Sequence, residues 1–217
     1  MIRKNKYTIA IAGGELADGI QKYLRGFGVP IDMSPDAKMC QQYGSLEFRI
    51  ARSRDVPKFL GRWDKIGIRA DFGITGYDCC YDESLAGGSF KYFSLLTSIG
   101  EGRLVLFTKK GVDLNVLENP VMAVSDYYTN IAKSTARFKK LKCNKILEVK
   151  GKVEGYVSAG EAGIGLDSCF TGETIKTQEN LEIKEEVMKT CAAVICRPEY
   201  IMTMQDFISL LYNYNKH

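Results

Sequence analysis

Short apolar runs alternate with helical patterns along most of the chain. The runs favour strands, because a strand buried on both faces of a sheet reads as a nearly continuous apolar segment. They predict strands at residues 7–12, 48–51, 72–75, 103–107, 121–124, 144–149, 165–168 and 190–196. Apolar residues at helical spacing predict helices at residues 16–27, 56–65, 127–138 and 202–214. This alternation is typical of an α/β protein with mainly parallel sheets.

Two segments mark expected crossings between two parts of the chain. One is the glycine-containing stretch at residues 96–102, and the other lies near residues 178–180. We therefore expect a first lobe built from residues 1–98 with 180–217, and a second lobe built from residues 99–179. The apolar stripe of the last predicted helix belongs either to the core or to an association face.

Charge and composition narrow the classes of protein. Lysine and arginine number 30 against 26 for aspartate and glutamate, and the basic residues are scattered, so no nucleic-acid partner is expected. No apolar run approaches the ~20 residues needed to cross a bilayer. The apolar stretch before Gly13 is too short for a signal peptide, so we expect a cytoplasmic protein with no membrane partner.

Histidine and cysteine usage excludes several chemistries. The seven cysteines include the adjacent Cys79 and Cys80, which does not suggest a disulfide framework. The only histidine, His217, stands at the terminus, so neither a Cys/His zinc site nor a histidine-activated nucleophile is expected. Chemistry must then rest on carboxylates, cations, backbone amides or a bound metal ion.

A phosphate-binding loop is predicted directly after the strand at residues 165–168. Backbone N–H groups at such a turn, threonine hydroxyls and a glycine that permits close approach together suit a phosphate. Asp167, at the strand end, is placed to meet ribose hydroxyls. The ordinary alternative is a strand–turn–helix connection in which Thr171 or Thr174 is an N-cap.

This segment is similar to the donor-binding signature of the ATP phosphoribosyltransferase family, an aspartate followed by three residues and T-G-x-T. The matching residues are Asp167, Thr171, Gly172 and Thr174. Three further family motifs follow the same order along the chain: R-x-R-D-I-P, G-x-x-D-x-G-I-x-G-x-D and G-x-x-E. They match here at Arg52, Arg54, Asp55 and Pro57; at Asp71, Gly73, Ile74, Gly76 and Asp78; and at Gly151 and Glu154.

The resemblance implies an activity and a fold. The family transfers the phosphoribosyl group of phosphoribosyl pyrophosphate to N1 of ATP, with Mg2+ and release of pyrophosphate, as the first step of histidine biosynthesis. The implied fold is two α/β lobes with a central cleft, similar to type II periplasmic binding proteins. The length matches the short form, which works in hetero-oligomers with a histidyl-tRNA-synthetase-like regulatory subunit, so an oligomer with such a partner is implied.

The resemblance also implies roles for individual residues. Catalysis would involve Asp167, Glu154 and Arg54. Substrate binding would involve Ser168, Cys169, Phe170, Thr171, Gly172, Glu173, Thr174, Arg52, Asp78, Gly13 and Gly14. The structural alternatives are a salt bridge from either arginine to Asp55 or Asp64, a first-turn helix carboxylate for Glu154, and a local backbone bond for Asp71.

The first strand departs from the family. Where members have K-G-R-L, this chain has Gly13, Gly14, Glu15 and Leu16. Lysine to glycine removes one positive charge and arginine to glutamate changes two more, at a place that meets substrate phosphates. Two alternatives therefore remain: a related phosphoribosyltransferase with a less phosphorylated acceptor, and a non-catalytic nucleotide- or anion-binding protein.

Overall fold

The computed structural model describes residues 6–138, 140–169, 180–200 and 203–213. Contacts divide the chain into two compact units: unit 1 comprises Met1–Gly100 and Cys191–His217, and unit 2 comprises Glu101–Thr190. The expected boundary near residue 180 is therefore wrong by about ten residues. The reason is that β10 (Leu181–Thr190) pairs along its length with β6 (Gly102–Lys109) of unit 2.

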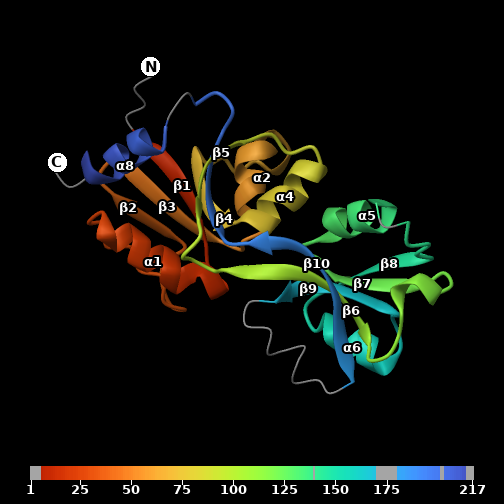
Figure 1. Cartoon of the computed structure of the whole chain (residues 1–217). Coiled ribbons are helices and arrows are strands. Elements are labelled where there is room, and N and C mark those ends of the chain that lie inside the picture. The colour runs from red at the N-terminus through yellow and green to blue at the C-terminus, as the bar shows by residue number, and fades with distance from the viewer. Residues whose placement is uncertain (1–5, 139, 170–179, 201–202, 214–217) are drawn as a thin grey trace. The chain divides into compact units, whose positions relative to one another are not determined.

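Unit 1 contains a six-stranded mixed sheet (Figure 1). Its strands in spatial order are β2 (Cys40–Tyr43), β3 (Leu46–Ala51), β1 (Tyr7–Ala12), β4 (Phe72–Gly76), β11 (Ala192–Cys196) and β5 (Lys91–Leu96). β1 runs parallel to both β3 and β4, whereas β11 lies antiparallel between β4 and β5. The carboxyl ends of β1, β3 and β4 therefore share one edge.

Helices cover both faces of this sheet (Figure 1). They are α1 (Ala17–Gly26), α2 (Val56–Gly61), α3 (Trp63–Ile66), α4 (Tyr77–Leu85) and α8 (Met204–Asn213), with a 3-10 turn, η1 (Gly14–Leu16), before α1. A β-carbon at Gly73 would lie 2.8 Å from Val56 Cγ1, so the glycine lets α2 pack close to β4. The Phe72 ring, one residue earlier and on the opposite face, lies 5.3 Å from that of Phe207 in α8.

Unit 2 contains a five-stranded mixed sheet in the order β10, β6, β9 (Ile164–Cys169), β7 (Val121–Ser125) and β8 (Lys145–Val149). β7 runs parallel to β8 and β9, and β6 runs antiparallel to β9 and β10. Helices α5 (Thr129–Phe138) and α6 (Val153–Ala159) lie on opposite faces of the sheet, and a 3-10 turn, η2 (Leu114–Val116), precedes β7 (Figure 1).

The face under α6 has its own core. Val105, Phe107, Val153 and Val157 are buried together there with Cys169. Any side chain at Gly165 would collide with the Phe107 ring, so a glycine is needed for β9 to pass beneath it. Because Gly165 and Cys169 face α6, strand alternation places Asp167 on the same face.

A buried ionic network closes the amino end of the unit 1 sheet. Asp71 is 1% exposed; it accepts a 2.9 Å bond from the Thr8 amide and forms a 3.1 Å ion pair with Arg197, which is 2% exposed. The Tyr200 hydroxyl donates a 2.6 Å bond to the same carboxylate, and burial together with this bond raises the pKa of Tyr200. The structural interpretation of Asp71 is therefore correct, although its partners are remote in sequence.

The sheets are mixed, so the expectation of mainly parallel sheets is wrong. The described strands make four parallel and five antiparallel pairings. The predicted helix at residues 56–65 is also interrupted at Arg62, between α2 and α3. No helix within the described ranges has the length and apolar character needed to span a bilayer.

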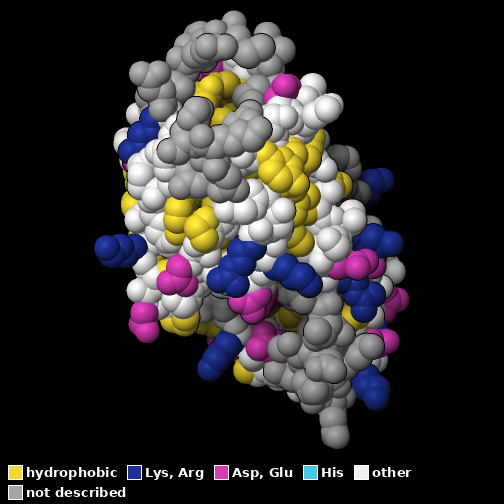
Figure 2. Space-filling view, turned by 90° about the vertical axis from the view of Figure 1, so that its left-hand side faces the viewer, with side chains coloured by type: hydrophobic (Ala, Val, Ile, Leu, Met, Phe, Trp, Pro, Cys, Tyr) yellow, Lys and Arg dark blue, Asp and Glu magenta, His cyan; other side chains and the backbone are white. Residues whose placement is uncertain are grey.

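The surface in Figure 2 carries interspersed charges. Basic and acidic side chains are intermingled on that face, and hydrophobic side chains form several separate patches, the larger of them mostly among uncharged atoms (Figure 2). This face therefore presents no extended field of a single sign.

Candidate active site

The carboxyl ends of β7, β8 and β9 form one edge of the unit 2 sheet. The register places Val124 beside Leu166, and Ser125 beside Val149. Ligands of α/β sheets bind outside the carboxyl ends of parallel strands. The residues at this edge are therefore Ser125, the turn after Val149, and Asp167 with Ser168.

Asp167 is half-buried near the carboxyl end of β9, on the face covered by α6. Its Oδ1 accepts a 2.8 Å hydrogen bond from the Ser168 amide. Ser168, half-buried, points to the opposite face by strand alternation. Cys169 is 5% exposed and belongs to the core under α6, which leaves mainly its backbone to meet a ligand.

Glu154 lies in the first turn of α6, close to the same edge and on the same face as Asp167. The turn before it contains Gly151 (φ +73°) and Lys152 (φ +55°), both in the left-handed region. Glu154 is half-buried and therefore not sealed in the core. The structure thus brings Asp167 and Glu154 to one end of one sheet face, and adds Ser125 and Lys152, which the sequence did not single out.

The rest of the predicted donor loop follows β9 in the sequence. Phe170, Thr171, Gly172, Glu173 and Thr174 lie outside the described residues, and their predicted role stays a prediction. The described part of the strand that leads to them ends at Cys169.

A second carboxyl edge gathers the predicted residues of unit 1. Gly13 follows β1, Arg52 follows β3 and Asp78 follows β4, three strands that run parallel. The Gly13 amide donates a 2.9 Å bond to the Ala51 carbonyl, so the turns after β1 and β3 meet. Gly14 has φ +68° and is exposed, with no atom within 4 Å of the position a β-carbon would take.

The two arginines differ in their surroundings. Arg52 is exposed, and no ion pair joins it to a carboxylate among the residues that the structure describes. Arg54 is half-buried, with Nε 4.0 Å from Asp55 Oδ1, while Asp55 makes a shorter, 3.0 Å pair with Lys58. The loop between them is fixed by a 2.8 Å bond from Thr75 Oγ1 to the Ser53 carbonyl.

Asp78 is more enclosed than a nucleotide contact requires. It is 3% exposed in the first turn of α4, and its carboxylate occupies the space beside Gly76 that a β-carbon would need. Its neighbours Cys79 and Cys80 are buried, and burial raises the pKa of both thiols well above the ordinary value. Asp78 as a nucleotide contact stays a prediction, whereas the two thiols are poor nucleophiles.

Among the described residues, no group of three or more His, Cys, Asp or Glu side chains is arranged to hold a metal ion by itself. Mg2+ is usually held by one or two carboxylates together with substrate phosphates. The half-buried Asp167 and Glu154 fit that more modest requirement.

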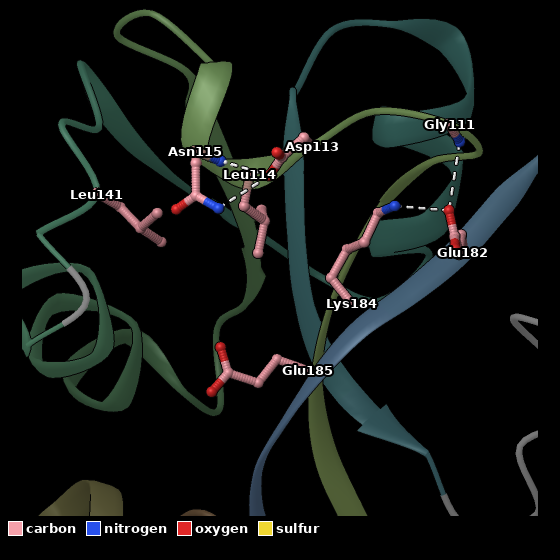
Figure 3. Close-up of a pocket in the computed structure, with 8 residues that line it drawn as sticks. All are labelled: Gly111, Asp113, Leu114, Asn115, Leu141, Glu182, Lys184 and Glu185. Atoms are coloured by element: carbon pink, nitrogen blue, oxygen red, sulfur yellow. Dashed lines mark hydrogen bonds and ion pairs between the residues drawn. The ribbon is translucent and has the colours of Figure 1, made fainter.

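A pocket of about 530 Å³ lies elsewhere in unit 2, beside β10 (Figure 3). It is lined by Gly111, Asp113, Leu114, Asn115, Leu141, Glu182, Lys184 and Glu185. Figure 3 shows Glu182 bridging the Lys184 ammonium and the Gly111 amide, at 2.6 and 3.3 Å. None of the predicted site residues lines this pocket, so it is not the site indicated by the motifs.

Comparison with known proteins decides the family. The sequence model of HisG: ATP phosphoribosyltransferase matches residues 52–214, about three quarters of the chain. The chain belongs to the ATP phosphoribosyltransferase family. It is 26% identical over 207 residues to the ATP phosphoribosyltransferase of Campylobacter curvus, covering 95% of this chain and 94% of that one. The Petrotoga mobilis ATP phosphoribosyltransferase is 24% identical, with 97% and 94% covered.

Solved structures agree on the fold. The ATP phosphoribosyltransferase (HisG:HisZ) complex from Thermotoga maritima aligns with a TM-score of 0.75 at 23% identity, covering 97% of both chains. The periplasmic sulphonate-binding protein SsuA from Escherichia coli aligns at 0.58, covering 98% of this chain and 72% of that one. The predicted family, the α/β fold similar to periplasmic binding proteins, and the phosphoribosyltransferase activity on phosphoribosyl pyrophosphate and ATP in histidine biosynthesis are confirmed.

Proposed function

We propose that this chain binds phosphoribosyl pyrophosphate at the carboxyl edge of the unit 2 sheet and transfers its phosphoribosyl group to N1 of ATP. The observation that carries the assignment is the carboxyl edge shared by the parallel strands β7, β8 and β9, where Asp167 and Ser168 of β9 stand shortly before the T-G-x-T segment in the sequence. Amides and hydroxyls from Thr171 to Thr174 would hold the 5-phosphate.

The reaction makes modest demands on protein groups. The lone pair of adenine N1 forms the new bond to C1 of the ribose while the bond from C1 to pyrophosphate breaks, and that electron pair leaves with pyrophosphate. No strong base is needed to create the nucleophile, which suits a chain without a usable histidine. Positive charge develops on the ribose, so an ionised Asp167 at its hydroxyls would both orient and stabilise it. Glu154 would assist from the same face.

A divalent ion, which we propose is Mg2+, would be held by the pyrophosphate together with Asp167 or Glu154. When bound, it neutralises charge that accumulates on the leaving group. The protein's own task is then to position the donor. Since both substrates are intracellular metabolites, we place this reaction in the cytoplasm.

Unit 1 supplies the proposed contacts to phosphates of the acceptor. The exposed Arg52 offers a forked pair of donors, and the half-buried Arg54 would assist it. The Gly13–Gly14 turn allows close backbone approach because nothing crowds Gly14. Asp78 would contact the nucleotide only after its carboxylate leaves the space beside Gly76.

A second candidate function keeps the donor and changes the acceptor. Glu15 is exposed immediately after the turn that ends β1, at the edge where Arg52 also stands. A carboxylate there repels a triphosphate more than a monophosphate, because Coulomb repulsion grows with the charge of the ligand. Repulsion by Glu15 is the one observation that favours this second candidate, an acceptor with fewer phosphates than ATP.

We further propose a regulatory partner. The Thermotoga maritima protein, which matches this chain over nearly its whole length, was solved as a HisG:HisZ complex. The corresponding hetero-oligomer here would pair this chain with a histidyl-tRNA-synthetase-like subunit. Co-expression with such a subunit, followed by co-purification, tests this; two separate peaks on gel filtration would contradict it.

The decisive experiment follows product formation by the absorbance of the N1-phosphoribosyl-adenine group, with ATP, ADP and AMP each tested as the acceptor. Turnover of ATP supports the first candidate, and turnover of AMP alone supports the second. Replacing Thr171 and Thr174 together by alanine should abolish binding of phosphoribosyl pyrophosphate. Unchanged affinity in that variant would refute the loop assignment.

A further inference from the structure

Lys152 occupies an unusual position. It is one of three non-glycine residues with positive φ among those described, the others being Asn119 and Lys140. A left-handed conformation is costly for a side chain such as lysine, and such residues often persist where function requires them. Lys152 also precedes α6 without any capping hydrogen bond from its side chain, so helix capping does not explain its presence.

The sheet places Lys152 at the donor edge. It lies three residues after Val149, the end of β8, and directly before α6. β8 is separated from β9 by β7 alone, so the two strands lie about 10 Å apart, two interstrand spacings. A lysine side chain extended from this turn spans much of that distance.

Lys152 also lies on the same face of the unit 2 sheet as Asp167. Val153 and Val157 of α6 pack with Cys169 in the core beneath the helix, and Asp167 points to that same face by strand alternation. Lys152 therefore enters α6 on the side of the sheet where Asp167 and Glu154 stand. Its side chain is exposed and makes no ion pair with a carboxylate within the described part of the chain.

We propose that Lys152 is an additional phosphate-binding residue, which contacts the phosphate groups of phosphoribosyl pyrophosphate. The inference rests on the proposed function, because it takes the donor to bind at the end of β9. A flexible ammonium suits this task, since it acts as a point charge on a phosphate. It also offsets the negative charges of Asp167 and Glu154, which would otherwise repel the donor.

Lys140 provides a matched control. It too is an exposed lysine with positive φ (+52°), in unit 2. It lies in the connection between α5 and β8, which leads to the amino end of β8 and therefore to the opposite edge of the sheet. Glycine at either position removes one positive charge and relieves the same backbone strain.

The test compares Lys152→Gly, Lys152→Gln, Lys152→Arg and Lys140→Gly by calorimetric titration with phosphoribosyl pyrophosphate. Lys152→Gly and Lys152→Gln should raise the Kd about tenfold or more, because a charged hydrogen bond is lost. Lys152→Arg should largely keep the affinity, and Lys140→Gly should leave it unchanged. Both glycine variants should raise Tm by about 2–4 °C through relief of strain.

The outcomes separate the inference from the function beneath it. If the unaltered chain binds the donor and both neutral Lys152 variants bind it equally well, the inference is overturned while the proposed function stands. The same holds if Lys140→Gly weakens binding as much as Lys152→Gly, because the effect is then one of net charge. If the unaltered chain does not bind phosphoribosyl pyrophosphate, both fall.

Discussion

Two aspartates stand at opposite ends of strands in the two sheets, and they have opposite surroundings. Asp71 precedes β4 at the amino end, is 1% exposed, and is held by Arg197, Tyr200 and the Thr8 amide. Asp167 lies near the carboxyl end of β9 and is half-buried. Both belong to motifs of the same family. The end of the strand, more than the motif, therefore separates the carboxylate that holds the fold together from the one that we propose contacts a ligand.

Removing the Asp71 charge should have the largest effect on stability. Asp71→Asn leaves the buried Arg197 with the exposed Glu199 as its remaining carboxylate partner, at 3.1 Å, which should cost about 3 kcal/mol of unfolding free energy, the low end for a broken buried ion pair. Urea denaturation followed by circular dichroism measures this. As a control, Asp55→Asn removes an ion pair whose side chains are about one third exposed and should cost less than about 1 kcal/mol. Equal losses in the two variants would contradict the contrast between buried and exposed carboxylates.

The same change at Asp167 should affect activity instead. Asp167→Asn keeps an oxygen acceptor for the Ser168 amide while removing the charge, so the fold should survive. We expect kcat/KM to fall about 100-fold, since a group that stabilises transition-state charge is lost. Steady-state kinetics of the variant checks the fall in kcat/KM, and its urea denaturation midpoint checks that the fold survives. A large destabilisation with a proportionate loss of activity would mean that Asp167, like Asp71, serves the fold and not the reaction.

Reversing the charge of Glu15 should have a smaller effect, on one substrate only. Glu15→Arg replaces repulsion by attraction at the carboxyl edge of unit 1, so KM for ATP should fall about three- to tenfold, less at high salt. KM for phosphoribosyl pyrophosphate should stay constant. Glu118→Arg makes the same charge change at an exposed site of unit 2. An equal fall in KM for ATP in Glu118→Arg would mean that the effect of Glu15→Arg comes from the net charge of the protein and not from its position.

The smallest expected effect concerns Glu47, a half-buried carboxylate of unit 1. Hydrogen bonds from Lys6 and Arg49 lower the pKa of Glu47 below its ordinary value of 4.5. Its contribution is therefore present above the unfolded pKa and is lost as the pH falls through the folded pKa. Glu47→Gln should cost less than about 1 kcal/mol at pH 7, and progressively less as the pH falls below 4.5. A cost that persists in acid would mean that charge is not its cause.

Strands buried on both faces could be predicted from the sequence. β1 was predicted at the residues where it is found, Tyr7–Ala12, because its apolar run is continuous. β10 could not, since charged residues occur throughout it and its pairing with β6 is irregular at Ile183 and Glu186. β6 and β11 were both predicted as strands, but their antiparallel direction depends on long-range pairing that no local pattern encodes.

Some features of the candidate site and its surroundings could likewise be predicted from the sequence, and others could not. Asp167 and Glu154 could be predicted because a motif marks them, and the structure brings them to one edge. The partner of Asp71 could not be found, since Arg197 is remote in sequence and only the folded chain joins them. The strained backbone of Lys152 was equally hidden, because a φ angle is a property of the turn and not of the residue type.

The position of β11 has a consequence for synthesis. β11 fits between β4 and β5, although it is made about a hundred residues after them. During synthesis on the ribosome, the whole of unit 2 is made before β11, so the edges of β4 and β5 that pair with β11 are still unpaired at that stage. Unit 2 therefore has all its strands before unit 1 does, although its synthesis begins later. A nascent chain halted near residue 190 would expose the two unpaired edges of β4 and β5 to chaperones.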